Sequence, residues 1–243
     1  MYYQLLLLSQ LVYSNGNVCS SHCYSYFPTF ANESKWLKPE TVVVISSKKQ
    51  LGTSKGSFRD MLEALGVRET GLLSGDSKQY QFENPSLGFL GKYQFAEILL
   101  IRLGYYKANV FYGRGADKNY WRGTWTKKNG IDSKSKFLNS PEVQEKAIRE
   151  AFRVYWQDIN DILKRQGKSI NNYLGHQKTF SDRSKSKTIT ITLSGILAGA
   201  HLRGSDRVAE LLVQGKVSQD EFGTSILDYV EEFGDYDITI NDF

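Results

Sequence analysis

Apolar residues recur at helical spacing soon after position 54. Ser57 is a residue type favoured at the N-cap, and Gly66 is expected to end the helix that follows it. The spacing of the apolar side chains places them on one side of a helix. The pattern therefore predicts a helix over residues 58–65, with a buried face made of Phe58, Met61, Leu62 and Leu65.

The longest helical pattern begins at Ser140, which is followed by Pro141 and Glu142. Serine at the N-cap and proline at the first helical position are a common start signal. We expect this helix to continue to about Lys164. Its apolar stripe predicts these buried positions: Val143, Ala147, Ala151, Val154, Ile159 and Ile162.

Four further helices are expected, over residues 92–103, 188–202, 206–213 and 218–233. Gly104 ends the first. The second is rich in small and apolar residues, which indicates a buried helix with close neighbours. The last begins with Asp220 and Glu221, where negative charge suits the helix dipole. Residues 70–90 should form a loop or short hairpin, and 105–139, rich in Gly and aromatic residues, should be irregular.

The first 53 residues differ from the rest, since no charged residue occurs before Glu33. Residues 41–45 predict one isolated strand. The apolar run 1–13 is too short for a transmembrane helix, and it is interpreted either as a signal-like segment that lacks the usual Lys or Arg, or as a buried element. Cys19 and Cys23 form a local disulfide or remain thiols, because no second ligand pair for zinc lies nearby.

The chain of 243 residues, 40% of them hydrophobic, is long enough for one sizeable core. We expect an N-terminal extension over 1–53 and one domain over 54–243. The predicted fold class is mainly α, with any β structure confined to short pieces.

A formal net charge of +5 suits a polyanionic partner such as a cell-wall polymer, a nucleic acid or an anionic membrane. Zinc-finger, helix-turn-helix and RNP signatures are absent from the sequence, so no nucleic-acid partner is expected. The one short basic run, Arg183, Lys185 and Lys187, is interpreted as a solvated loop. Charge alone does not choose among the remaining classes of partner.

Candidate chemistry begins at Glu69, which is expected to lie directly after the first helix. A glycosidase needs a carboxylic acid held partly out of water, so that its pKa rises and it can protonate a glycosidic oxygen. Gly91 would let the backbone approach a sugar, and Gln94 would hydrogen-bond an acetamido or hydroxyl group. Alone, Glu69 is an ordinary helix-end glutamate, and the joined pattern is what favours catalysis.

Glu69-Thr70-Gly71 followed by Gly91-Lys92-Tyr93-Gln94 resembles the E-S-x…G-x-x-Q signature of soluble lytic transglycosylases and goose-type lysozymes, within the lysozyme-like superfamily. Residues 200–208, Ala-His-Leu-Arg-Gly-Ser-Asp-Arg-Val, resemble the A-Y-N-A-G-x-x-R-V segment of the same family. The resemblance covers residues 54–234. It implies an α+β lysozyme-like fold in which helices surround a substrate groove.

The resemblance implies Glu69 as the sole catalytic acid and base, with substrate contacts at Gly91, Tyr93, Gln94, His201 and Gly204. Three departures are present: Thr70 for Ser, His201 for Tyr and Leu202 for Asn. The alternative for His201 is a core histidine satisfied by backbone. Aromatic rings that would pack on sugars are Tyr93, Tyr112, Tyr120, Trp121 and Trp125.

The reaction implied is cleavage of the bond between N-acetylmuramic acid and N-acetylglucosamine with an anhydro product. It requires no metal or cofactor, and its place of action would be the periplasm, the cell envelope or outside the cell. One alternative is hydrolysis, in which Asp76 or Glu83 supplies a second carboxylate. Another is a non-catalytic glycan-binding protein.

Overall fold

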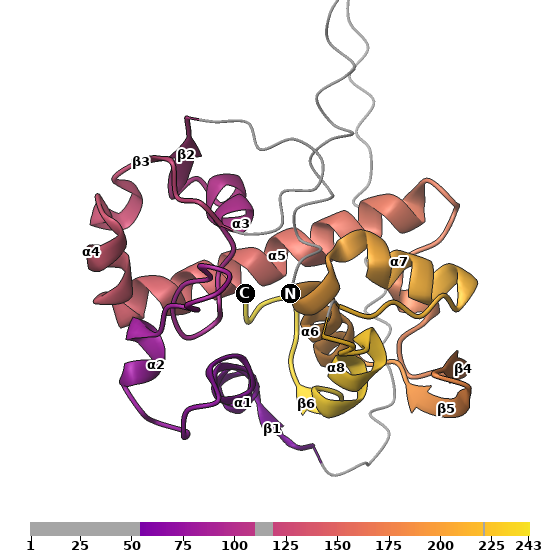
Figure 1. Cartoon of the computed structure of the whole chain (residues 1–243). Helices are drawn as coiled ribbons and strands as arrows, with labels where there is room; N and C mark the ends of the chain where they lie inside the picture. The colour runs from indigo at the N-terminus through magenta and orange to yellow at the C-terminus, as the bar shows by residue number, and fades with distance from the viewer. Residues whose placement is uncertain (1–53, 110–118, 221) are drawn as a thin grey trace, which may run out of the picture.

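The computed structural model describes residues 54–109, 119–220 and 222–243. The predicted strand at 41–45, the apolar run 1–13, both cysteines, Tyr112 and Glu221 lie outside these ranges. Helix α5, Pro141–Lys164, passes through the middle of the molecule (Figure 1). Its 24 residues make it about 36 Å long.

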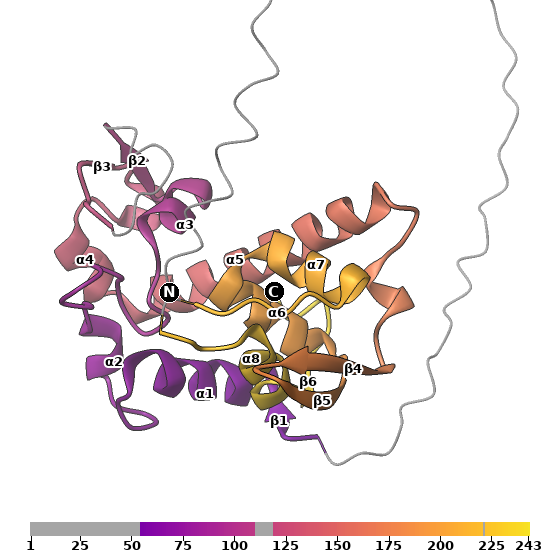
Figure 2. The same cartoon turned by 45° about the vertical axis from the view of Figure 1, so that its right-hand side comes forward.

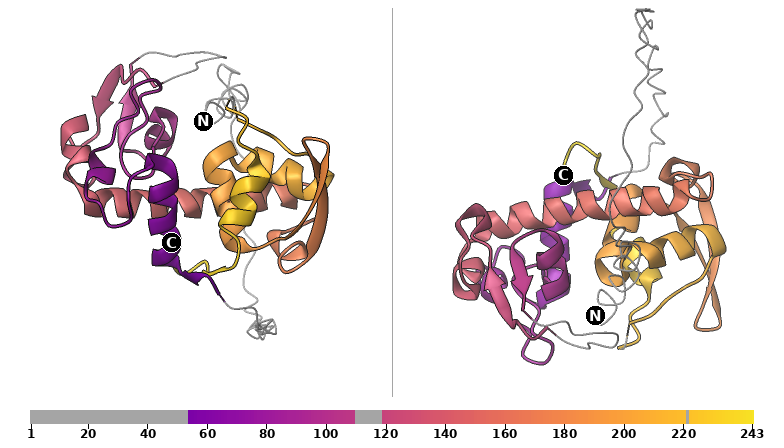
Figure 3. Two further views of the ribbon diagram at one scale, coloured as in Figure 1. Left: turned by 60° about the horizontal axis from the view of Figure 1, so that its bottom comes forward. Right: turned by 90° about the horizontal axis from the view of Figure 1, so that it is seen from above.

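The predicted bounds of α5 are confirmed, with Pro141 in the first turn after Ser140. Four of its predicted core positions are buried, and Val154 and Ile162 are partly buried against the core. In Figure 3, α1 to α4 with β2 and β3 lie along one half of α5, and α6 to α8 with β4 and β5 lie along the other half. Helix α5 therefore joins two groups of elements.

Helix α1, Phe58–Thr70, has the predicted N-cap and the predicted buried face. Ser57 and Asp60 form a reciprocal capping box. The expected end at Gly66 is wrong, because the helix continues to Gly71, whose φ of 70° closes it. Packing explains the glycine at position 66, because a Cβ there would lie 2.5 Å from the Lys92 side chain. Glu69 consequently lies in the last turn of α1.

The helix predicted over 92–103 is shorter than expected, since α3 spans only Glu97–Arg102. Residues 91–94 form a turn between Leu90 and Phe95, which bridge to each other, and Gln94 has a φ of 45°, a value incompatible with a helix. Before them, α2, Lys78–Gln81, interrupts the predicted loop, and Glu83 forms an isolated bridge with Leu90.

Residues 105–139 contain short elements within irregular backbone. Strands β2, Tyr106–Ala108, and β3, Gly123–Trp125, pair antiparallel. The 3-10 turn η2, Lys128–Gly130, and helix α4, Lys134–Leu138, follow.

The predicted start of the buried helix at Thr188 is wrong, because residues 185–190 form a strand. After the turn η3, Ile170–Asn172, β4, Gln177–Asp182, pairs antiparallel with β5, Lys185–Thr190. The run Thr188-Ile-Thr-Ile-Thr192 alternates with period two, which is a strand pattern.

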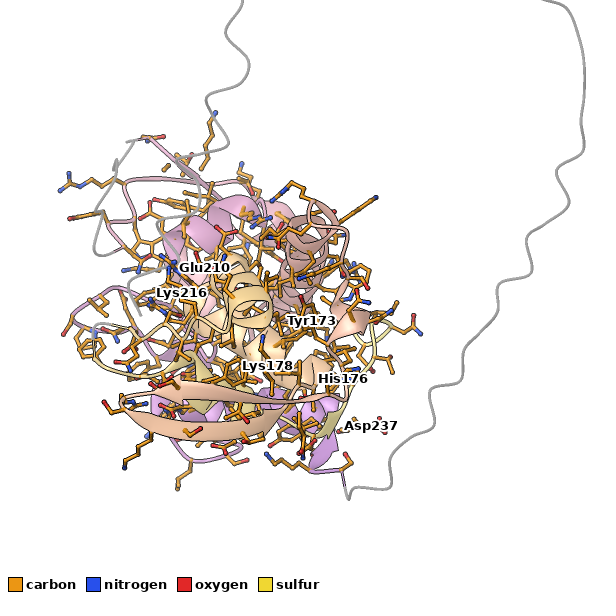
Figure 4. The ribbon with its side chains drawn as sticks, turned by 90° about the vertical axis from the view of Figure 1, so that its right-hand side faces the viewer. Tyr173, His176, Lys178, Glu210, Lys216 and Asp237 are labelled. Carbon is orange, nitrogen blue, oxygen red and sulfur yellow. The ribbon has the colours of Figure 1, made fainter. Side chains whose placement is uncertain are left out.

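The basic run at 183–187 is not the expected solvated loop. Lys185 and Lys187 belong to β5, and Arg183 lies in the turn. Arg183 pairs with Asp228 at 2.7 Å and Lys187 with Glu231 at 2.6 Å, so this hairpin is joined to α8 (Figure 2). On the other side Lys178 donates to the Leu212 carbonyl at 2.6 Å, at the end of α7 (Figure 4).

Helix α6, Leu193–Arg203, is the expected buried helix with close neighbours. All its residues from Ser194 to Arg203 are buried. A Cβ on Gly195 would lie 2.4 Å from the Val230 carbonyl oxygen, so this glycine lets α8 approach α6 closely. Helix α7, Ser205–Gln214, agrees with prediction to within one residue at each end.

The last helix was predicted too long, since α8 covers only Ile226–Glu232. Asp220 instead accepts backbone hydrogen bonds from Phe222 and Thr224 in a turn, and Gln219 bridges to Ser225. Strand β6, Tyr236–Asp237, then pairs parallel with β1, Gly56–Ser57. The two ends of the described domain thus meet beside α1.

The described residues form a mainly α fold whose strands are short pairs, as predicted. No helix within the described ranges is long and apolar enough to cross a membrane.

Candidate active site

Glu69 is a buried carboxyl at the meeting point of α1, α6 and α8. Only 6% of its side-chain surface is exposed. Burial penalises the ionised form and raises the pKa of Glu69 to about 7, while a hydrogen bond from Tyr229 opposes this shift. At neutral pH a substantial fraction of Glu69 therefore carries a proton.

The Tyr229 hydroxyl donates a hydrogen bond of 2.9 Å to Oε1 of Glu69. Its ring lies 5.4 Å from the Arg68 guanidinium, which also pairs with Glu232 at 3.6 Å. Burial raises the pKa of Tyr229 well above its usual range, so the hydroxyl is a donor. Sequence reasoning missed Tyr229, because a buried tyrosine in a predicted helix carries no sign of a partner 160 positions away.

His201 of α6 lies beside the carboxyl, with its Nε2 3.8 Å from Oε1 of Glu69. The same nitrogen lies 3.0 Å from the Tyr93 carbonyl oxygen. Burial lowers the pKa of His201 to about 4, so the ring is neutral near pH 7. Each interpretation from the sequence has one observation in its favour: Nε2 of His201 has a backbone partner, and the ring lies next to Glu69.

The segment 91–94 supplies that carbonyl and is tightly constrained. A Cβ on Gly91 would lie 2.0 Å from Oε1 of Gln144, so packing against α5 explains this glycine. Gln94 is buried and its Nε2 donates to the Gly91 carbonyl at 2.8 Å. Its buried Oε1 has no hydrogen-bond partner among the described residues. A substrate N–H or O–H group would satisfy that oxygen.

Tyr93 is fully buried, and its hydroxyl donates to Glu145 at 2.6 Å. Trp121 and Trp125 are partly buried and stack on each other with centroids 5.9 Å apart. Trp121 also donates from its indole nitrogen to the Gly88 carbonyl at 2.7 Å. Tyr120 is the more exposed neighbour, with Arg122 lying over its ring.

The remaining positions of the motifs have local structural contacts. The Thr70 hydroxyl donates to the Gly66 carbonyl at 2.7 Å, within the last turn of α1. Gly204 joins α6 to α7 with a φ of 85°. Leu202 is buried.

The two candidate second carboxylates contact other parts of the chain. Asp76 accepts from the Lys78 backbone at 2.9 Å, and Glu83 pairs with Lys134 at 2.6 Å. Glu69 has neither as a hydrogen-bond or ion-pair partner. Within the described part of the chain, no group of three or more His, Cys, Asp or Glu side chains is arranged to hold a metal.

Comparison of the chain with models of protein families, with curated protein sequences and with solved structures found no match. The functional interpretation therefore rests on the motifs and on the geometry around Glu69.

Proposed function

We propose that the chain cleaves peptidoglycan as a lytic transglycosylase, with Glu69 as its acid and base. The observation that carries the proposal is the buried carboxyl of Glu69, whose pKa of about 7 suits a proton donor at neutral pH. Because Tyr229 donates to Oε1, the other oxygen, Oε2, is left to carry the proton.

In the proposed reaction, Glu69 gives its proton to the glycosidic oxygen as the bond from that oxygen to C1 of N-acetylmuramic acid breaks. The substrate's own acetamido oxygen stabilises the positive C1. The ionised Glu69 then takes the proton of the C6 hydroxyl, and the C6 oxygen bonds to C1. One enzymic carboxyl suffices, as in substrate-assisted glycosidases.

This single-carboxyl chemistry fits the surroundings of Glu69, since Asp76 and Glu83 are engaged with Lys78 and Lys134. A hydrolase that inverts would hold its second carboxylate about 6.5–9.5 Å from the first, with a water between them. The released products distinguish the two reactions directly.

The test is digestion of purified peptidoglycan, followed by mass spectrometry of the released muropeptides. We expect 1,6-anhydro ends from the unaltered chain, no release by Glu69→Gln, and unchanged release by Glu142→Gln, which alters an exposed glutamate in the first turn of α5. Reducing ends would mean a hydrolase. Equal release by Glu69→Gln would refute the assignment of Glu69.

A further inference from the structure

Lys92 is a buried cation held between two helices. Its side chain is 5% exposed, and its Nζ lies 2.6 Å from Glu63 of α1 and 3.2 Å from Glu145 of α5. A buried charge is tolerated when opposite charges and hydrogen bonds surround it. The Lys92 ammonium also donates to the Tyr80 hydroxyl at 3.3 Å. Lys92 therefore links α1 and α5 to the segment 91–94.

The neighbouring backbone is fixed by the same groups. The Lys92 N–H donates to Oε1 of Gln144, whose Nε2 donates to two backbone carbonyls. The Tyr93 hydroxyl donates to Glu145, and the Lys92 ammonium lies 5.4 Å from the Tyr93 ring. The peptide bond between Tyr93 and Gln94 is consequently held in place by the Tyr93 side chain, by Lys92 and by Gln144.

The carbonyl of that peptide bond is the hydrogen-bond partner of His201. A carbonyl oxygen only accepts hydrogen bonds, so the Nε2 of His201, 3.0 Å away, carries the hydrogen and donates it. The ring is neutral, so Nδ1 carries none. The hydrogen bond thereby selects one tautomer.

We propose that Lys92 is a positioning residue, which fixes the Tyr93 carbonyl through Glu63 and Glu145 and so holds His201 as the neutral Nε2–H tautomer beside Glu69. The catalytic meaning of this arrangement rests on the function proposed above. Lys92 forms neither a hydrogen bond nor an ion pair with Glu69, and it acts only through the Tyr93 carbonyl and His201.

The charge of His201 affects the pKa of Glu69 and therefore its ability to donate a proton. A cation within about 4–6 Å lowers the pKa of a carboxyl by about 1–3 units. Among the described residues, the groups facing Glu69 are Arg68 on its own helix, Tyr229 from α8, His201 from α6 and, more distantly, Asp220. Arg68 and Tyr229 already favour ionisation, so a protonated His201 would remove the raised pKa that a proton donor needs.

The test uses the full chain with ¹⁵N-labelled histidine and ¹³C-labelled glutamate, observed by NMR across pH. We expect the unaltered chain to show a protonated Nε2 and an unprotonated Nδ1 at His201. In Lys92→Met we expect mixed tautomers, because the Tyr93 carbonyl that selects the Nε2–H form is no longer held in place. Lys164→Met, which removes an exposed lysine at the end of α5, should leave both signals unchanged.

Two milder variants keep the test decisive if Lys92→Met fails to fold. Glu145→Gln removes one charge of the pair, and Tyr93→Phe removes only the hydroxyl while keeping the carbonyl. Each should weaken the tautomer preference, Glu145→Gln more strongly. Folded variants with an unaltered His201 tautomer would overturn the proposal.

These readouts do not depend on activity. A chain that releases no muropeptides but shows the expected His201 signals would refute the proposed function and leave the positioning role intact. If the chain is active but the His201 tautomer is the same in Lys92→Met, only the positioning role is refuted.

Discussion

Tyr229 donates a hydrogen bond of 2.9 Å to Oε1 of Glu69, linking the last turn of α1 to the middle of α8. The bond favours the ionised carboxyl, whereas burial favours the protonated one. Burial is the larger of these two effects, so the pKa of Glu69 is raised.

Tyr229→Phe should raise the pKa of Glu69 further, by about one unit, because a hydrogen bond to the charged form is lost. The alkaline limb of the activity profile should move to higher pH by the same amount. Titration of ¹³C-labelled glutamate measures the shift. Tyr173→Phe is the control, since the Tyr173 hydroxyl forms no hydrogen bond with the described residues. A lower Glu69 pKa in Tyr229→Phe would contradict the prediction.

The raised pKa of Glu69 also predicts how stability depends on pH. The folded chain holds this proton up to about pH 7, and the unfolded chain releases it near the ordinary glutamate pKa of 4.5. Between these values the folded state binds more protons, so the contribution of Glu69 to the free energy of unfolding falls as pH rises.

Glu69→Gln removes that dependence. The difference in free energy of unfolding between Glu69→Gln and the unaltered chain should rise by about 3 kcal/mol, in favour of Glu69→Gln, from pH 4 to pH 8. Urea unfolding at the two pH values measures the gain, and Glu142→Gln should show little change. A difference between Glu69→Gln and the unaltered chain that is the same at both pH values would mean that the folded pKa is ordinary.

Much of the helical framework could be predicted from local signals. Ser140 and Pro141 mark the start of α5, and its apolar stripe follows the helical period to Lys164. Thr188 to Thr192 was misassigned because its small and apolar residues also suit a buried helix, although their alternation marks a strand. Turns such as Gln94 escaped prediction because tertiary contacts, not local preference, impose a positive φ there.

The candidate site was only partly predictable for the same reason. Glu69 and His201 could be singled out because the segments that contain them resemble motifs of a known family. Tyr229, Glu63 and Glu145 act through partners on other elements, and their spacing in the sequence carries no sign of those contacts. The assignment of Tyr93 to a sugar contact rested on its ring, whereas its carbonyl is the group that reaches His201.

Gly91→Ala should destabilise the fold strongly. Its φ of 75° disfavours a side chain, and the new Cβ would lie 2.0 Å from Oε1 of Gln144. We expect a loss of about 3 kcal/mol from combined strain and overpacking. Gly71→Ala has a similar φ but open space around it, so it should lose only about 1–2 kcal/mol. Chemical denaturation compares them, and equal losses would show that Gln144 does not constrain this loop.

Gly195→Ala should separate α6 from α8, because its Cβ would meet the Val230 carbonyl at 2.4 Å. Tyr229 precedes Val230, so we expect a weaker hydrogen bond to Glu69 together with a stability loss of about 1–3 kcal/mol. Gly199→Ala is the matched control, since its Cβ would meet side chains and no backbone, the nearest atom being Cγ2 of Val230 at 3.0 Å. Thermal melts and the Glu69 titration should change more in Gly195→Ala, and the reverse order would contradict the prediction.

The most direct measurement is the rate at which soluble muropeptides are released from peptidoglycan by the unaltered chain, Glu69→Gln and Glu142→Gln, each verified as folded. We expect release with anhydro ends by the first and third, and a loss of at least about a hundredfold for Glu69→Gln, because general acid catalysis contributes roughly that much or more. Release by Glu69→Gln at the rate of the unaltered chain would contradict the role proposed for Glu69.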